Sequence, residues 1–146
     1  MRAKVLSEAV GARSWMLVFD KGDEVEPALL QFAAAHNVNT AGLSGIGGFS
    51  SVKLGYFDRS DMQYHPNPLN EQVEVMSLLG NIAISGEERK LHAHVVVGRN
   101  DGTARGGHLL EAQVWPTLEL VLAEFPASLQ RKPDDETGLS LIDPEA

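Results

Sequence analysis

The chain has 146 residues, of which 43% are hydrophobic, and this size and composition are typical of one globular domain with a buried core. It contains no cysteine, which excludes disulfides, thiolate nucleophiles and cysteine-ligated zinc sites, so any metal must be held by His, Asp or Glu. The formal net charge is -8 and the pI about 5.0, so the average surface repels phosphate backbones and argues against autonomous DNA binding.

The N-terminal segment lacks the continuous apolar stretch of a secretion signal. No stretch of the chain reaches the roughly 18 consecutive apolar residues that a membrane-spanning helix needs. We therefore expect a cytoplasmic protein without a membrane partner.

The first elements expected along the chain are a strand and a helix. Residues 15–19 are apolar and favour a strand that polar and glycine residues end. An amphipathic helix is expected over residues 24–37, with Asp23 as its N-cap. Because His36 lies on the apolar face of this helix, we expect it to pack or to cap rather than to catalyse. That apolar face comprises Val25, Leu29, Phe32, Ala33 and His36.

The middle of the chain predicts antiparallel β structure. Residues 40–58 and 70–98 are two β regions interrupted by glycines, and the polar, proline-containing residues 60–70 are expected to form a surface loop between them. Residues 85–90 are typical of a hairpin connection, and residues 99–102, with the sequence Arg-Asn-Asp-Gly, are typical of a turn. The last large element, over residues 117–126, alternates in a way that suits a half-buried strand and also permits a short helix, and we favour the strand.

The C-terminal segment is polar and acidic. We expect residues 1–130 to form one domain and residues 131–146 to form an acidic tail. Three apolar residues of this tail have the character needed to dock back onto the body: Leu139, Leu141 and Ile142.

Three of the five histidines lie within 17 residues of one another along the chain. In a strand, alternate side chains share a face, so His92 and His94 are neighbours about 6 to 7 Å apart along the backbone. His108 follows two glycines that permit a close approach, so a neighbouring strand can deliver it beside the pair. Three neutral imidazoles would then form a zinc-type site with an open coordination position.

The alternative is that these histidines line a polar sheet face or a subunit interface, because a bare His-X-His occurs often by chance. No carboxylate is fixed by spacing as a further partner, and Glu74 and Glu111 are candidates only.

A small basic group lies near the histidines in the sequence. Its members, Lys90, Arg99 and Arg105, suit a small anionic ligand better than a DNA duplex. A solvated turn region explains the same residues equally well.

One family to compare is the metal-binding cupins, whose first motif begins with glycine, five residues and His-X-His, as Gly86 to His94 do. The match ends there, because the acidic residue expected a few positions later falls near Gly98 or Arg99. The second cupin motif is absent around His108.

The chain resembles the PPC ("plants and prokaryotes conserved") domain over nearly its entire length. The resemblance lies in the order of five segments: VFDKGDEVEPALLQFAAAHNV, AGLSGIGGFSSVKLGYFD, VEVMSLLGNIAI, LHAHVVVG and ARGGHLLEAQVWPTLELVL. It implies an α/β fold of the α+β type, with a mixed, largely antiparallel sheet and one main helix, assembled as a homotrimer. The family's recurrent histidines correspond to His92, His94 and His108. Its acidic residue corresponds to Glu74, which this resemblance makes the candidate catalytic residue, to orient a ring or act as a general base.

The family also carries the label "putative DNA-binding", which comes from plant members that have AT-hooks. An AT-hook needs an Arg-Gly-Arg-Pro core, and the nearest match here, Arg105-Gly106-Gly107, lacks the second arginine and the proline.

The sequence leaves three hypotheses for the function. One is a homotrimer with a histidine-lined site for zinc, another divalent metal or a small ligand; the second is a module that binds DNA, or proteins on DNA; the third is a purely structural oligomerisation domain.

Overall fold

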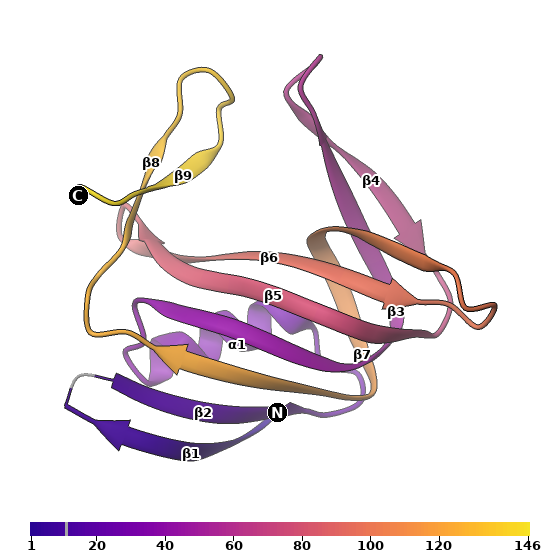
Figure 1. Ribbon diagram of the computed structural model, residues 1–146, viewed down its shortest axis with the longest axis horizontal. Coiled ribbons are helices and arrows are strands. Elements are labelled where there is room, and N and C mark those ends of the chain that lie inside the picture. Colours follow the sequence, from indigo (N-terminus) through magenta and orange to yellow (C-terminus); the bar gives the residue numbers. More distant parts are fainter. Residues whose placement is uncertain (11) are drawn as a thin grey trace.

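The computed structural model describes residues 1–10 and 12–146, which form one sheet with a single α-helix behind it (Figure 1). In the described part of the chain, no helix is long and apolar enough to cross a membrane. The elements are β1 (Arg2–Ala9), β2 (Ala12–Phe19), α1 (Val25–Ala35), β3 (Ala41–Asp58), β4 (Gln63–Leu69), β5 (Val73–Ser85), β6 (Glu88–Gly98), β7 (Ala104–Glu124), β8 (Gln130–Pro133) and β9 (Ser140–Asp143).

The centre of the sheet closes on itself. Strand β7 pairs with β3 along most of its length, β3 pairs with β5, β5 pairs with β6, and β6 pairs with the beginning of β7. These pairs are antiparallel, and the one parallel pair in the described sheet joins β5 to β8. The predicted fold, a mixed and largely antiparallel sheet with one main helix, is therefore confirmed.

The core contains the apolar residues that alternate along the predicted strands. Leu118, Leu120 and Leu122 of β7 are fully buried, so residues 117–124 form a strand and not a helix. Helix α1 packs against β6 and β7 with its predicted apolar face inward. The predicted hairpin is also present, because Ser85 pairs with Glu88 across a tight turn in which Gly86 has a φ of 63°.

The N-terminal end of α1 is capped differently from the prediction, whereas the C-terminal end agrees with it. Glu24, not Asp23, is the N-cap, and its side chain makes no capping bond. The carboxylate of Asp23 instead accepts a hydrogen bond from the Asp20 N–H and pairs with the amino group of Met1, 2.9 Å away. His36 is the C-cap, as expected, and its Nδ1 lies 3.0 Å from the Phe32 carbonyl oxygen.

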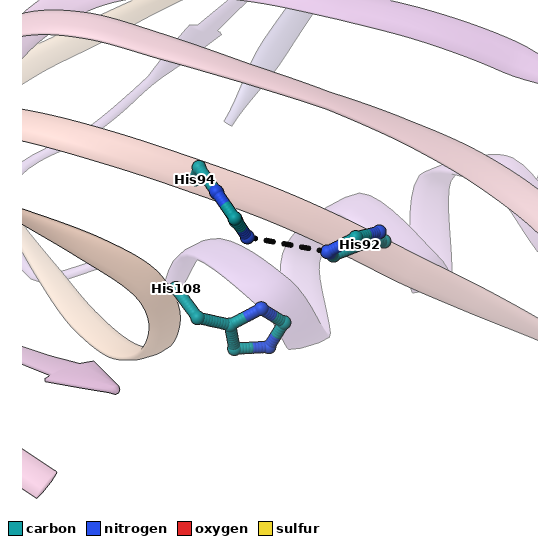
Figure 2. Close-up of side chains that lie close together, drawn as sticks. All are labelled: His92, His94 and His108. Atoms are coloured by element: carbon teal, nitrogen blue, oxygen red, sulfur yellow. Dashed lines mark hydrogen bonds between the residues drawn. The ribbon is translucent and has the colours of Figure 1, made fainter. Parts of the chain in front are cut away.

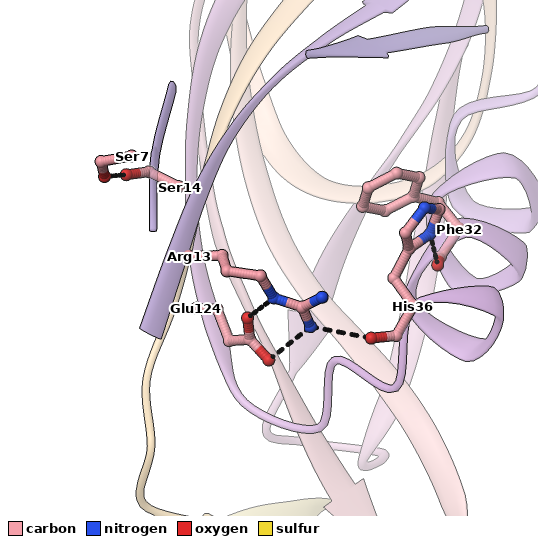
Figure 3. Close-up of polar contacts among 6 residues, drawn as sticks. All are labelled: Ser7, Arg13, Ser14, Phe32, His36 and Glu124. Carbon is pink, nitrogen blue, oxygen red and sulfur yellow. Dashed lines mark hydrogen bonds and ion pairs between the residues drawn. The ribbon is translucent and has the colours of Figure 1, made fainter. Parts of the chain in front are cut away.

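Arg13 connects β2, β7 and the end of α1 (Figure 3). Its guanidinium donates two hydrogen bonds to Glu124, at 2.6 and 3.1 Å, and a third to the His36 carbonyl oxygen at 2.8 Å. The carboxylate and the helix-end carbonyl thus share one cation, which fixes the helix against the sheet.

Residues 60–70 are not wholly a loop, and this expectation was wrong. They are mostly exposed, but Gln63–Leu69 form β4, which pairs with the far half of β3. Pro66 and Pro68 are compatible with a strand here because, among residues 1–10 and 12–146, β4 pairs with β3 alone, and a proline at an open edge removes no ladder hydrogen bond.

The C-terminal residues form a hairpin of β8 and β9 that rises from the edge of β5 (Figure 1). Ser85 and Ser140 hydroxyls lie 3.0 Å apart and fasten the hairpin to β5. Leu139 and Ile142 are half-buried, whereas Leu141 is exposed. The division between domain and tail at residue 130 stays a prediction.

Candidate metal centre

Strand β6 presents its histidines on the outer face of the sheet. Ala93, Val95 and Val97 are buried in the core, so the alternate positions, occupied by His92 and His94, face outward. His94 is exposed and His92 is half-buried. Because the apolar residues of β6 must face the core, both imidazoles point away from it.

Strand β7 supplies the third histidine. His108 lies directly opposite His94 in the β6–β7 ladder, so its side chain falls on the same face. Gly107 permits this approach, because a Cβ there would come 2.8 Å from the Gly55 carbonyl oxygen of β3. The glycine thus lets β7 lie close to β3 while β7 carries His108 beside β6.

The three rings converge (Figure 2). The Nε2 atoms of His92 and His94 are 3.3 Å apart, and one ligating nitrogen from each ring lies within 4.8 Å of the other two. Zinc–nitrogen bonds of about 2.0 to 2.1 Å in a tetrahedral arrangement require nitrogens roughly 3.3 to 3.4 Å apart. The His92–His94 pair already meets this requirement, and the ligating nitrogen of His108 lies within 4.8 Å of both.

The protonation of the rings favours ligation. Burial is the main cause that lowers the pKa of His92, with smaller effects from His94 and Arg131. Burial, followed by the neighbouring His92 and His94, lowers the pKa of His108 to about 4. At neutral pH these two rings are uncharged, which is the state that binds a metal.

The donor set fits a borderline-soft divalent metal such as zinc. All three donors are imidazole nitrogens, as in three-histidine zinc sites. Among the described residues, no carboxylate or further histidine adds a fourth ligand to this cluster. The exposed side of His94 leaves room for a solvent or ligand atom. Tyr64 of β4 lies beside the third ligand, with its hydroxyl 3.5 Å from His108 Nδ1 and its ring tilted over the imidazole.

The acidic candidates lie outside this cluster. Glu74 is opposite Gly98, four residues beyond His94 along β6, which is roughly 13 Å at a strand's rise per residue. It lines a separate depression with Glu71 and Arg99, whose side chains pair at 2.7 Å. Glu111 pairs with Lys53 of β3.

Of the three basic candidates, the structure brings only one to the histidines. Lys90 shares the face of His92, two residues away, and lines one cavity together with His92 and His108. Arg99 is engaged by Glu71 and lies in the other depression. Arg105 is three residues from His108 on β7, so it points to the opposite face.

Tyr64 and Arg131 lie beside the cluster but were not predicted from the sequence. Tyr64 lies in the segment expected to be a loop, and its pairing through β4 could not be recognised from polar, proline-rich residues. Arg131 lies in the expected tail, and no local pattern signals that β8 pairs with β5.

Comparison with known proteins identifies the family. A model of the Plants and Prokaryotes Conserved (PCC) domain matches residues 6–126. The chain belongs to the PCC domain family. This confirms the resemblance to the PPC domain that the ordered segments indicate, and the matched residues include all three histidines of the cluster.

Solved structures of PCC-like proteins share the fold along nearly the full chain. A protein described as a "putative DNA binding protein" from Bacteroides thetaiotaomicron has a TM-score of 0.89 and 26% identity, with 99% of each chain covered. A PPC protein from Pyrococcus horikoshii has a TM-score of 0.85 and 30% identity, over 97% of this chain and 94% of that one. A metal-containing protein from Archaeoglobus fulgidus has a TM-score of 0.83 and 29% identity, over 88% and 91%. No curated protein sequence matches the chain.

Proposed function

We propose that this PCC domain binds one divalent metal ion, with zinc as the first candidate, through His92, His94 and His108. The observation that carries the proposal is the convergence of three ligating nitrogens within 4.8 Å, two of them already at 3.3 Å. The structural neighbour from Archaeoglobus fulgidus, which is described as metal-containing, supports it.

The fourth coordination position would be open to water or a small ligand. A metal there supplies Lewis acidity and lowers the pKa of bound water. The chain's own contribution is to hold three neutral imidazoles on rigid strands and to place the Tyr64 hydroxyl beside His108.

Calorimetric titration of zinc into the wild type, His92→Ala and His108→Ala at neutral pH tests this proposal. Tight one-to-one binding is expected in the wild type, with a strong loss in both variants because two imidazoles leave zinc short of its tetrahedral set. His36→Ala is the control, because this histidine caps α1 and lies outside the cluster. Equal affinity in all four proteins, or none in the wild type, would contradict the proposal.

We also propose that copies of the chain associate through the outer face of the sheet as a homotrimer. Ile46, Met76 and Leu79 are large apolar residues that are more than half exposed, and they line one shallow depression. An exposed apolar patch of this kind on a sheet is typical of an interaction surface. A closed cyclic assembly would cover it in every copy.

A further inference from the structure

A positively charged site adjoins the histidine cluster, and its central residue lies outside the residues that match the PCC family model. Its centre is Arg131 of β8, which is only 8% exposed. Its guanidinium donates hydrogen bonds to the Asn81 side-chain oxygen at 2.6 Å and to the Ser140 carbonyl oxygen at 2.9 Å. Asn81 lies directly opposite His92 in the β5–β6 ladder, so the guanidinium lies next to the first metal-ligand candidate.

The charge of Arg131 is not compensated. Both of its hydrogen-bond acceptors are neutral, its Nε is buried without any partner, and no carboxylate among the described residues forms an ion pair with it. Burial lowers the pKa of this guanidinium, yet an arginine side chain stays protonated in proteins. A buried cation without a counter-ion is costly, and a bound anion would relieve that cost.

Arg131 lines a cavity of about 300 Å³ together with Tyr64, Lys90, His92 and His108. Lys90 adds a second positive charge from the exposed end of β6, and the cavity lining contains no Asp or Glu among the described residues. Leu139 and Leu141 of the C-terminal hairpin supply an apolar wall. Two cations, a hydroxyl and an apolar wall are complementary to a small organic molecule that carries one anionic group.

We propose that this cavity binds a small organic anion, a carboxylate or a phosphate monoester with a short apolar body. The anionic group binds to Arg131 and Lys90, and the apolar body packs against Leu139 and Leu141. His92 and His108 of the cluster line the same cavity, so the anion would be the ligand presented to the metal. Only this last point rests on the proposed metal site, because the two cations and the apolar wall are present without a metal.

The probes are 4-methylpentanoate, the corresponding phosphate ester 3-methylbutyl phosphate, and the neutral 4-methylpentanamide. Binding is followed by chemical-shift changes of the isotope-labelled protein, once after treatment with a chelator and once with one equivalent of zinc. At least one anion is expected to bind the chelator-treated protein, at least about tenfold more tightly than the amide, since a hydrogen bond to a charged group is worth about 1.5 to 3 kcal/mol. Which anion binds more tightly distinguishes a carboxylate from a phosphate ligand.

Three variants test the residues. Arg131→Gln is expected to weaken anion binding at least about tenfold, and Lys90→Gln, an exposed position that does not endanger folding, several-fold. Arg105→Gln removes the same charge from the opposite face of β7 and should leave affinity within about twofold. Equal affinity in all three variants and the wild type, or equal binding of amide and anions, would overturn the anion site. Loss of zinc binding with anion binding intact would instead overturn only the metal proposal.

Discussion

Single residues decide how closely the strands that carry the histidines approach one another. Gly106 and Gly107 are adjacent in β7, but their surroundings differ. A Cβ at Gly107 would lie 2.8 Å from a β3 carbonyl oxygen, whereas a Cβ at Gly106 would make ordinary contacts no shorter than 3.4 Å. The sequence shows both glycines, but only the three-dimensional packing shows which one is required.

Gly107→Ala is therefore expected to lower the free energy of unfolding by about 1 to 3 kcal/mol, as overpacking does, and to weaken zinc binding by displacing His108. Gly106→Ala is the matched control and should change stability by less than about 1 kcal/mol. Urea unfolding and zinc titration of both variants measure these effects. Equal destabilisation by the two substitutions would contradict the close approach of β7 to β3.

The half-buried imidazoles of His92 and His108 make the metal-free protein sensitive to acid. The unfolded chain binds a proton at His108 near pH 6.5, but the folded chain does so only near pH 4, because burial lowers the pKa of this residue. Between these values the unfolded state holds more protons, so stability falls as the pH falls, and His92 acts in the same direction.

Thermal unfolding in the presence of a chelator, at pH 7 and at pH 4.5, measures this effect. The fall in Tm between these two pH values is expected to be smaller in His108→Gln than in the wild type, because the variant has lost one of the titrating groups. An identical fall in both proteins would show that His108 titrates normally.

At the scale of elements, local patterns predicted those elements whose residues show clear periodicity or turn signals. The helix, the hairpin between β5 and β6, and the alternating leucines of β7 all follow from periodicity and turn residues. The β4 strand pairs with its neighbour β3 across the short connection 59–62, but its polar and proline-rich residues lack the alternation that signals a strand. The C-terminal hairpin depends on pairing with the distant β5, which its acidic sequence does not signal. The alternation of side chains along β6 was enough to predict that His92 and His94 share a face. Tyr64 and Arg131 could not be assigned to the same site, because β4 and β8 were not recognised as strands.

The attachment of α1 to the sheet depends on Arg13, which joins β2, β7 and the helix end (Figure 3). Arg13→Gln is expected to lower the free energy of unfolding by about 1.5 to 3 kcal/mol, because it removes charge-assisted bonds between partly buried groups. Arg2→Gln, at a strongly exposed position, should change it by less than about 0.5 kcal/mol. Similar values for both substitutions in urea unfolding would exclude this role of Arg13.

At the scale of the whole molecule, the exposed apolar depression predicts self-association, and the family resemblance implies a trimer. Light scattering at micromolar concentration should give three times the chain mass of 15.8 kDa. Ile46→Glu places a charge in the exposed apolar depression and should shift the protein towards monomer, whereas Val10→Glu, at a fully exposed position outside that depression, should not. A monomer mass for the wild type would refute the trimer.

The net charge of the molecule also bears on DNA, the ligand named for one of its structural neighbours. With a charge of -8, binding to random duplex near 150 mM salt is expected to be weaker than the roughly 10⁻⁴ to 10⁻⁶ M typical of nonspecific binders. Fluorescence anisotropy over a series of salt concentrations measures this. A submicromolar Kd with a steep salt dependence would show that DNA is a direct partner.

The central claim is that three imidazoles from two adjacent strands share one metal ion. X-ray absorption at the zinc edge, on protein loaded with one equivalent of zinc, tests it most directly. The account predicts three imidazole nitrogens and one further light atom at about 2.0 to 2.1 Å, with one imidazole fewer in His108→Ala. A zinc environment without imidazole, or one that is unchanged in His108→Ala, would contradict it.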